Sequence, residues 1–262
     1  MREHVVTISI RNTSRIKSKE YKWEYSNDPS YKSREVARIY EALNSNKIAC
    51  RVRNPDTWKG FSWQHSPKVL IIKDNKEIIG YATIERWPPP DEMIVAEINA
   101  KNHKRDIYRA IVKIIYDSAI RENKGIIKFY VPYNHPLVST LLPYGIKVES
   151  EYLWSGGGKA RIINLKKTLE EISKELSIRS SDLKGDISII TEEESVTLKV
   201  NKGDIRILEG AGSVNNITIN SGETVQMILG YRNPLEIISS LETHGEVGLL
   251  EKLFPMKTPY VW

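Results

Sequence analysis

Residues 95–131 constrain the fold of this chain more than any other stretch. An apolar run at residues 95–100 is followed by a polar turn and then by apolar residues at helical spacing across residues 107–119. Gly125 ends this helix, because glycine takes the left-handed C-cap conformation at little cost. Residues 126–131 have the composition of a strand. A strand–helix–strand unit of this length predicts a parallel crossover, whose first strand-to-helix turn is a natural place to bind an anion.

Further elements of the first half follow from local patterns. Residues 11–33 are expected to be mostly irregular, because polar, charged and aromatic side chains are mixed there without a period. We expect strands at residues 5–10, 68–72 and 77–84, a helix capped by Ser33, a short helix opened by Asn134-His135-Pro136, and a strand pair at residues 147–154 and 160–165.

The second half has a different pattern. A connecting helix is expected at residues 165–176. Alternating apolar residues at 196–200 and 205–207 flank Asn201-Lys202-Gly203-Asp204, which is a hairpin signal. Helical patterns follow up to Leu253. Strands followed by helices predict a small α+β domain.

Charge also divides the chain. Residues 1–166 hold 29 Lys and Arg against 18 Asp and Glu, a net +11, whereas residues 167–262 hold 10 against 15, a net −5. This asymmetry supports a domain boundary near residue 166. The basic half could attract nucleic acid, an acidic protein or a phosphorylated cofactor, and a solvated lysine-rich surface is the alternative.

Several classes of protein are disfavoured. The single cysteine, Cys50, excludes a disulfide framework and fits a reducing compartment. No apolar run reaches membrane-spanning length, and residues 1–15 lack the pattern of a signal peptide. We therefore expect a cytoplasmic protein without a membrane partner. The five histidines show no metal-ligand spacing.

Two groups of motifs resemble a known family. Residues 35–165 resemble a GNAT acetyltransferase domain, with a helix, antiparallel strands ending in Ile78-Ile79-Gly80-Tyr81, the central strand–helix–strand, and Asn134 and Gly145 near the end. Residues 166–262 resemble the sterol-carrier-type domain of the enhanced-intracellular-survival (Eis-like) acetyltransferases. That part of the resemblance rests on Ile228-Leu229-Gly230-Tyr231-Arg232, Leu253-Phe254-Pro255 and Pro259-Tyr260-Val261-Trp262.

The resemblance implies an α/β domain at residues 1–165, with a GNAT-like mixed sheet and flanking helices. A sterol-carrier-like α+β domain of sheet and helices would follow at residues 166–262. Eis-like proteins usually carry two GNAT domains, and the one present here is more similar to their second, which does not hold the cofactor.

The resemblance also implies acetyl-CoA as the cofactor. In working GNAT domains, two glycines of the strand-to-helix turn let backbone N–H groups close on the pyrophosphate. Asp106 and Tyr108 stand at those positions here, adding a negative charge and bulk, which counts against binding. Cations of the run Lys101-Asn102-His103-Lys104-Arg105 could instead hold phosphates by charge. The candidate cofactor contacts are Ile98, Asn99, Ala100, Lys104, Arg105 and Asn134.

Acetyl transfer to an amine needs a base, and usually an acid that protonates the departing thiolate. The resemblance makes Glu97 the candidate base, and an outward-pointing strand carboxylate is the alternative. Leu141 stands where the family places its tyrosine acid. Tyr133 and Tyr144 lie near that position and are the candidate substitutes.

Three functions stay open on this basis. The first is an acetyl-CoA-dependent N-acetyltransferase acting on an amine of a small molecule or a peptide. The second is a catalytically degenerate GNAT domain that serves as a binding or scaffold module. The third is recruitment to nucleic acid through the basic half, where Trp23 and neighbouring tyrosines among lysines could stack on bases. The expected partners are an amine or peptide acceptor, nucleic acid, a homo-oligomer, or a separate chain with another GNAT domain.

Overall fold

The computed structural model describes residues 2–28, 31–44, 68–86, 88–132, 134–152, 160–238, 243–244 and 247–256. The chain divides into two compact units, Met1–Gly157 and Gly158–Val261, and each is considered by itself. The domain boundary expected after residue 165 stays a prediction. No helix in these described ranges is long and apolar enough to cross a bilayer.

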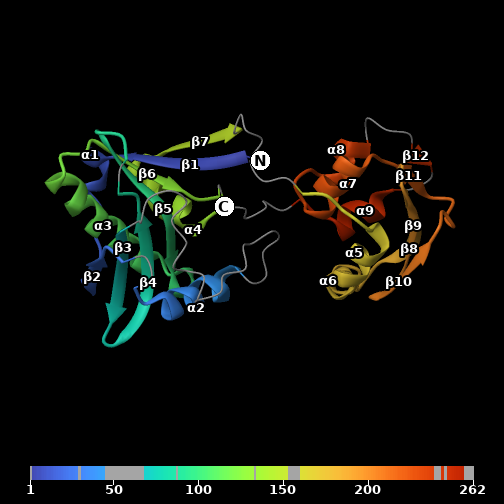
Figure 1. Ribbon diagram of the computed structural model, residues 1–262, viewed down its shortest axis with the longest axis horizontal. Coiled ribbons are helices and arrows are strands. Elements are labelled where there is room, and N and C mark those ends of the chain that lie inside the picture. Colours follow the sequence, from blue (N-terminus) through green and yellow to red (C-terminus); the bar gives the residue numbers. More distant parts are fainter. Residues whose placement is uncertain are drawn as a thin grey trace. The chain divides into compact units, whose positions relative to one another are not determined.

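The first unit is built on a mixed sheet (Figure 1). Its strands are β1 (Arg2–Ser9), β2 (Lys22–Ser26), β3 (Lys68–Asp74), β4 (Glu77–Ile84), β5 (Glu92–Ala100), β6 (Ile126–Tyr130) and β7 (Lys147–Tyr152), in the order β2-β3-β4-β5-β6-β1-β7. Strands β5 and β6 run parallel, and the other neighbours are antiparallel. The predicted crossover is therefore confirmed, with α3 (Arg105–Arg121) as its helix.

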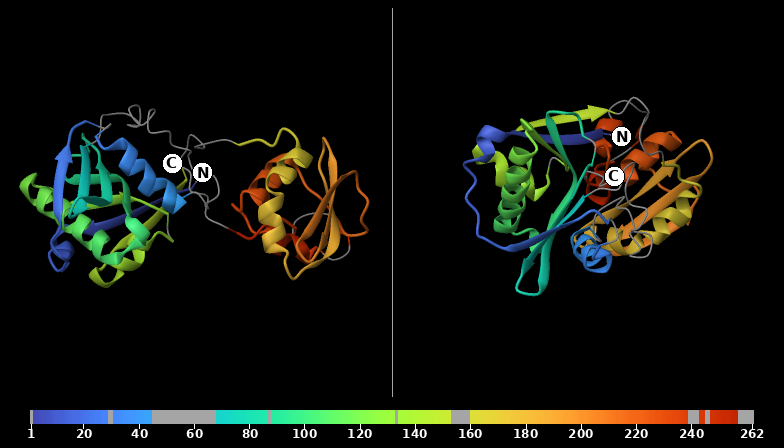
Figure 2. Two further views of the ribbon diagram at one scale, coloured as in Figure 1. Left: turned by 90° about the horizontal axis from the view of Figure 1, so that it is seen from below. Right: turned by 60° about the vertical axis from the view of Figure 1, so that its left-hand side comes forward.

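Helices cover both faces of this sheet (Figure 2). Successive side chains of a strand point to opposite faces. Leu70 and Ile72 of β3 accordingly belong to the core under α3, whereas Val69 and Ile71 pack under α2 (Ser33–Asn44). Gly80 lets α3 approach the sheet closely, because a Cβ there would lie 2.8 Å from Ile107 Cγ2.

Residues 11–33 are more regular than the sequence predicts. The short helix α1 (Ile10–Thr13) and strand β2 both lie in this segment or at its edge. Strand β2 pairs with β3, and the Tyr25 hydroxyl lies 3.0 Å from Ser118 Oγ of α3. The expectation of irregular structure is therefore wrong for β2, since pairing with a sheet edge supplies the order that local periodicity does not reveal.

The expected strand pair at residues 147–154 and 160–165 is also wrong. Strand β7 pairs with β1, which lies at the amino-terminal end of the chain, with Val5 opposite Glu149. Residues 160–164 form no strand, and Asn164 instead caps α5 (Leu165–Glu171) by accepting a hydrogen bond from Lys167 N at 2.7 Å.

The second unit consists of a sheet and helices that cover one of its faces (Figure 1). Its described strands are β8 (Lys184–Ile190), β9 (Ser195–Asn201), β10 (Asp204–Glu209), β11 (Asn216–Thr218) and β12 (Thr243–His244), in the order β10-β9-β8-β11-β12. The helices are α5, α6 (Ser173–Arg179), α7 (Ser221–Ile228), α8 (Pro234–Ile238) and α9 (Gly248–Leu253). The predicted hairpin of β9 and β10 is confirmed, and the expected connecting helix is two short helices, α5 and α6.

Candidate functional site

The parallel strands β5 and β6 separate within the sheet. Their pairing ends at Val95 and Phe129, whereas β5 stays paired with β4 as far as Ala100. Residues 96–100 therefore have a strand edge that β6 does not cover. An extended ligand can add its own hydrogen bonds to such an edge. We call the space between the diverging strands the wedge, and it is the candidate site.

Glu97 belongs to a polar cluster on the sheet face that also carries the core under α2. The strand pairing sets Tyr81 directly opposite Asn99. The Tyr81 hydroxyl donates a hydrogen bond to Glu97 Oε1, and Asn99 Nδ2 donates to the same oxygen at 3.1 Å and to Tyr81 Oη at 2.9 Å. These donors hold the carboxylate in one orientation. Asn99 is 1% exposed, and its Oδ1 has no hydrogen-bond partner among the described residues.

Tyr108 extends from the first turns of α3 to the carboxyl end of β5. Tyr108 is 0% exposed, and its hydroxyl lies near the backbone of Ala100, the last residue of β5. The Tyr108 hydroxyl also lies 3.0 Å from His103 Nδ1, and its ring packs edge-on against His135, with centroids 5.4 Å apart. Since His135 caps α4 (Pro136–Leu141), which follows β6, the ring contacts residues on both the β5 side and the β6 side of the wedge.

This burial also fixes the charge state of the phenol. Desolvation raises the pKa of Tyr108 well above its ordinary value, and the hydrogen bond with the Ala100 backbone opposes the shift only in part. The group is therefore a neutral phenol at physiological pH. A neutral, buried ring beside the wedge offers no charge to a ligand.

The strand-to-helix turn contains the candidate phosphate-binding cations. Lys104 and Arg105 are exposed and have no ionic partner within the described ranges. Asp106 forms an ion pair with Arg109, with Oδ1 and Nη1 3.2 Å apart. A carboxylate in the first turn of a helix stabilises the positive end of the helix dipole, which is where a phosphate would otherwise bind.

The remaining candidates lie around the same sheet edge. The side chains of Ile98 and Ala100 are buried in the core under α3. Asn134 is exposed before α4, and Tyr144 is half-buried against the core in the turn of residues 142–144. Tyr133 lies outside the described residues. The roles assigned to these residues stay predictions.

The sequence interpretation gave no role to Tyr81, and to His135 only that of opening a helix. Tyr81 reaches Glu97 because of the register between β4 and β5, and a hairpin pattern does not fix that register. His103 and His135 meet at Tyr108 only after the crossover has formed, with ring centroids 6.2 Å apart. No local signal in the sequence reports that contact. The described residues hold no cluster of side chains suited to a metal ion.

Comparison with known proteins identifies the fold. No protein-family model and no curated protein matches the sequence. A probable N-acyltransferase of unknown function from Enterococcus faecalis V583 matches 98% of this chain and 64% of its own, at 14% identity and a TM-score of 0.69. A GCN5-related N-acetyltransferase from Anabaena variabilis matches 100% and 66%, at 12% identity and a TM-score of 0.67. Eis1 from Mycobacterium abscessus matches 99% and 67%, at 15% identity and a TM-score of 0.61.

These likenesses show a mixed α/β sheet with flanking helices of the GNAT type. The expected GNAT-like fold is thus confirmed. The chain spans 64% of the length of the Enterococcus protein and 66% of the Anabaena protein.

Proposed function

We propose that this chain is a non-catalytic GNAT-fold protein that serves as a binding or scaffold module. The observation that carries the proposal is the position of Tyr108. Its buried ring contacts residues on both sides of the wedge, and a fold of this type would need the space between them for the pantetheine and pyrophosphate of acetyl-CoA.

The energy of opening the wedge supports this proposal. Moving a fully buried aromatic ring into water costs roughly 1.5–3 kcal/mol of burial free energy. The contact between the Tyr108 hydroxyl and His103 would be lost as well. A ligand that must displace the ring therefore binds on the order of 10- to 100-fold more weakly than it would to an open wedge.

The charge at the turn acts in the same direction. Asp106 places a carboxylate, 69% exposed, where two phosphates of the cofactor would lie. Its partner Arg109 is engaged by this ion pair, so the helix end offers less positive potential to an anion.

The experiment is a calorimetric titration of acetyl-CoA into the wild-type protein and two variants. Tyr108→Ala opens the wedge, and we expect it to bind acetyl-CoA at least about tenfold more tightly than the wild type. Tyr108→Phe is the matched control, because it keeps the ring and should bind as weakly as the wild type. Equal affinity of all three proteins, or thioester turnover by the wild type, would contradict the proposal. Circular dichroism establishes that each variant is folded.

An active N-acetyltransferase is the second candidate, and the Glu97 cluster favours it. A carboxylate oriented by Tyr81 and Asn99 at the middle of β5 is suited to accept a proton from an amine, directly or through water. On this alternative, acetyl-CoA is the cofactor and an amine of a small molecule or a peptide is the acceptor. Release of free thiol from acetyl-CoA that Glu97→Gln abolishes would support it.

We also propose that the second unit is a sterol-carrier-like domain. Its sheet with helices on one face supports this assignment. The partner that fits a non-catalytic GNAT module is a separate chain that carries a working GNAT domain.

A further inference from the structure

A cavity of about 380 Å³ lies beside the first unit's sheet, at the turn of the β3–β4 hairpin. Side chains of α2, of the hairpin and of the turn after β5 line it, and they include five cations and two carboxylates. The volume is within the range of small-molecule sites in proteins. The net charge of the lining is positive, so the expected ligand is an anion.

Part of this lining is held in place by neighbouring side chains. Lys73 Nζ lies 2.5 Å from Glu24 Oε1, and the Tyr31 hydroxyl donates to the same carboxylate oxygen at 2.8 Å. The hydrogen bond with Glu24 raises the pKa of Lys73, so its positive charge is secure. Lys101 is likewise paired with Glu77. These pairs fix two ammonium groups at the cavity wall.

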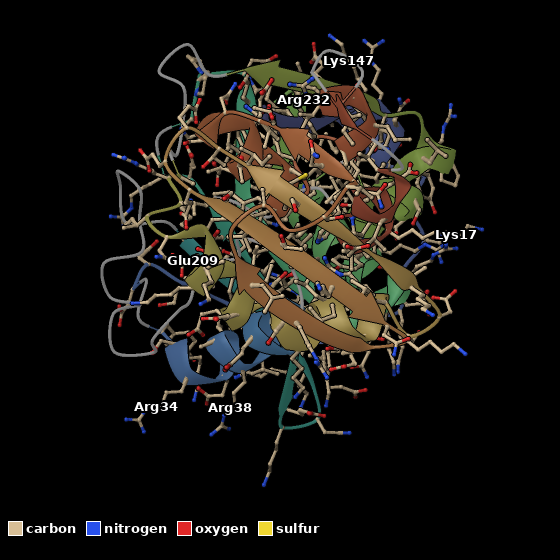
Figure 3. All side chains as sticks on the ribbon, turned by 90° about the vertical axis from the view of Figure 1, so that its right-hand side faces the viewer. Lys17, Arg34, Arg38, Lys147, Glu209 and Arg232 are labelled. Atoms are coloured by element: carbon tan, nitrogen blue, oxygen red, sulfur yellow. The ribbon has the colours of Figure 1, made fainter. Side chains whose placement is uncertain are left out.

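Two further cations are not engaged in this way. Arg38 of α2 and Lys76 of the hairpin turn are exposed and have no ionic partner in the part of the chain that the structure describes. Figure 3 shows Arg38 projecting outward from α2. A guanidinium can bind a phosphate with two hydrogen bonds, and an ammonium adds a point charge. Together with Lys73 and Lys101, they surround the cavity from three elements.

The lining of the cavity also has an apolar part. Ile39 and Leu43 of α2 and Ile78 of β4 supply apolar atoms beside the cations. A binding surface with apolar and cationic parts suits a ligand that has several phosphate groups, alone or joined to a less polar part. A single carboxylate would leave most of the cations unused.

We propose that this cavity binds a small molecule that carries two or more linked phosphate groups. The source is either a nucleoside polyphosphate or a free inorganic polyphosphate. The cavity shares Lys101 and Asn102 with the strand-to-helix turn, but the core beside it is not the one beside the wedge, because Ile78 packs in the core under α2 whereas Tyr108 packs in the core under α3 on the opposite face. The proposal therefore stands whether or not the wedge accepts acetyl-CoA.

The test is a calorimetric titration with tripolyphosphate, ATP and adenosine, at low and moderate salt. The wild type should bind tripolyphosphate and ATP but not adenosine. The double variant Arg38→Ala/Lys76→Ala should weaken both interactions by at least about tenfold, because it removes the two unpaired cations. Tighter binding of ATP than of tripolyphosphate identifies a nucleotide as the source, and equal binding identifies the phosphate chain alone.

The matched control is Arg34→Ala/Lys17→Ala, which also removes two positive charges. Arg34 is exposed on α2 without lining the cavity, and Lys17 lies well apart from α2 (Figure 3). This control should bind like the wild type. Equal weakening in both double variants would show diffuse attraction to a basic surface and overturn the proposal, as would the absence of binding or equal binding of adenosine. Unchanged phosphate binding in Tyr108→Ala would separate this site from the wedge.

Discussion

At the scale of single residues, the proposed non-catalytic role depends on Tyr108. One side chain contacts the end of β5, the turn residue His103 and the cap of α4. The sequence predicts that Tyr108 lies at the start of α3 and that its bulk conflicts with a phosphate-binding turn. The sequence does not predict the burial of Tyr108 or its contacts with two histidines, because both depend on how closely α3 packs against the sheet.

The buried phenol predicts a specific pH dependence of stability. The pKa of Tyr108 is raised in the folded protein, so its contribution to the free energy of unfolding is complete below the ordinary tyrosine pKa of about 10 and falls as the pH rises above it. Tyr108→Phe has no such group and should lose less stability between neutral and alkaline pH. Tyr25, whose pKa is also raised by burial, is common to both proteins and cancels in the difference.

Urea unfolding of the two proteins at neutral pH and above pH ~10 measures this difference. At neutral pH the variant should be less stable by roughly 0.5–1.5 kcal/mol, because the contact with His103 is lost. Parallel loss of stability by both proteins at alkaline pH would show that Tyr108 is not buried as described.

At the scale of elements, the crossover β5–α3–β6 organises the first unit. The sequence predicts this crossover because the apolar spacing and the helix end at Gly125 agree over residues 95–131. Strand β2 and the partner of β7 were mispredicted for one reason. Strands β2 and β7 are the two edge strands of the sheet, and their partners lie far away in the sequence, with Ile72 opposite Trp23 and Val5 opposite Glu149. Periodicity within a segment carries no information about such pairing.

The close approach of α3 to the sheet predicts a cost at Gly80. An added methyl group would meet Ile107 Cγ2 at 2.8 Å and Asn99 O at 3.2 Å, so helix or strand must shift. We expect Gly80→Ala to lower the free energy of unfolding of the first unit by about 1–3 kcal/mol, as overpacking does in other cores. Gly212→Ala is the control, because its nearest contact, Thr197 Oγ1 at 3.6 Å, is an ordinary one. Gly212 lies in the second unit, so this control should leave the first unit as stable as in the wild type. Urea unfolding compares them, and a first unit that is as stable in Gly80→Ala as in Gly212→Ala would contradict the packing described.

At the scale of the whole molecule, two units of opposite charge follow one another in the chain. Their charges were readable from composition, and so was a change of architecture between them. The sequence does not predict catalytic competence, because this depends on whether the space between two diverging strands is open. In the first unit Tyr108 packs in the core under α3, and most of the lining of the proposed phosphate cavity lies on the other face of the sheet.

The most direct measurement is a crystal structure of the wild-type protein grown with excess acetyl-CoA. We expect density for the Tyr108 ring between Ala100 and His135, and no pantetheine chain along residues 96–100. A pantetheine chain hydrogen-bonded to that strand edge, with the Tyr108 ring displaced from it, would contradict the assignment of this chain as a non-catalytic module.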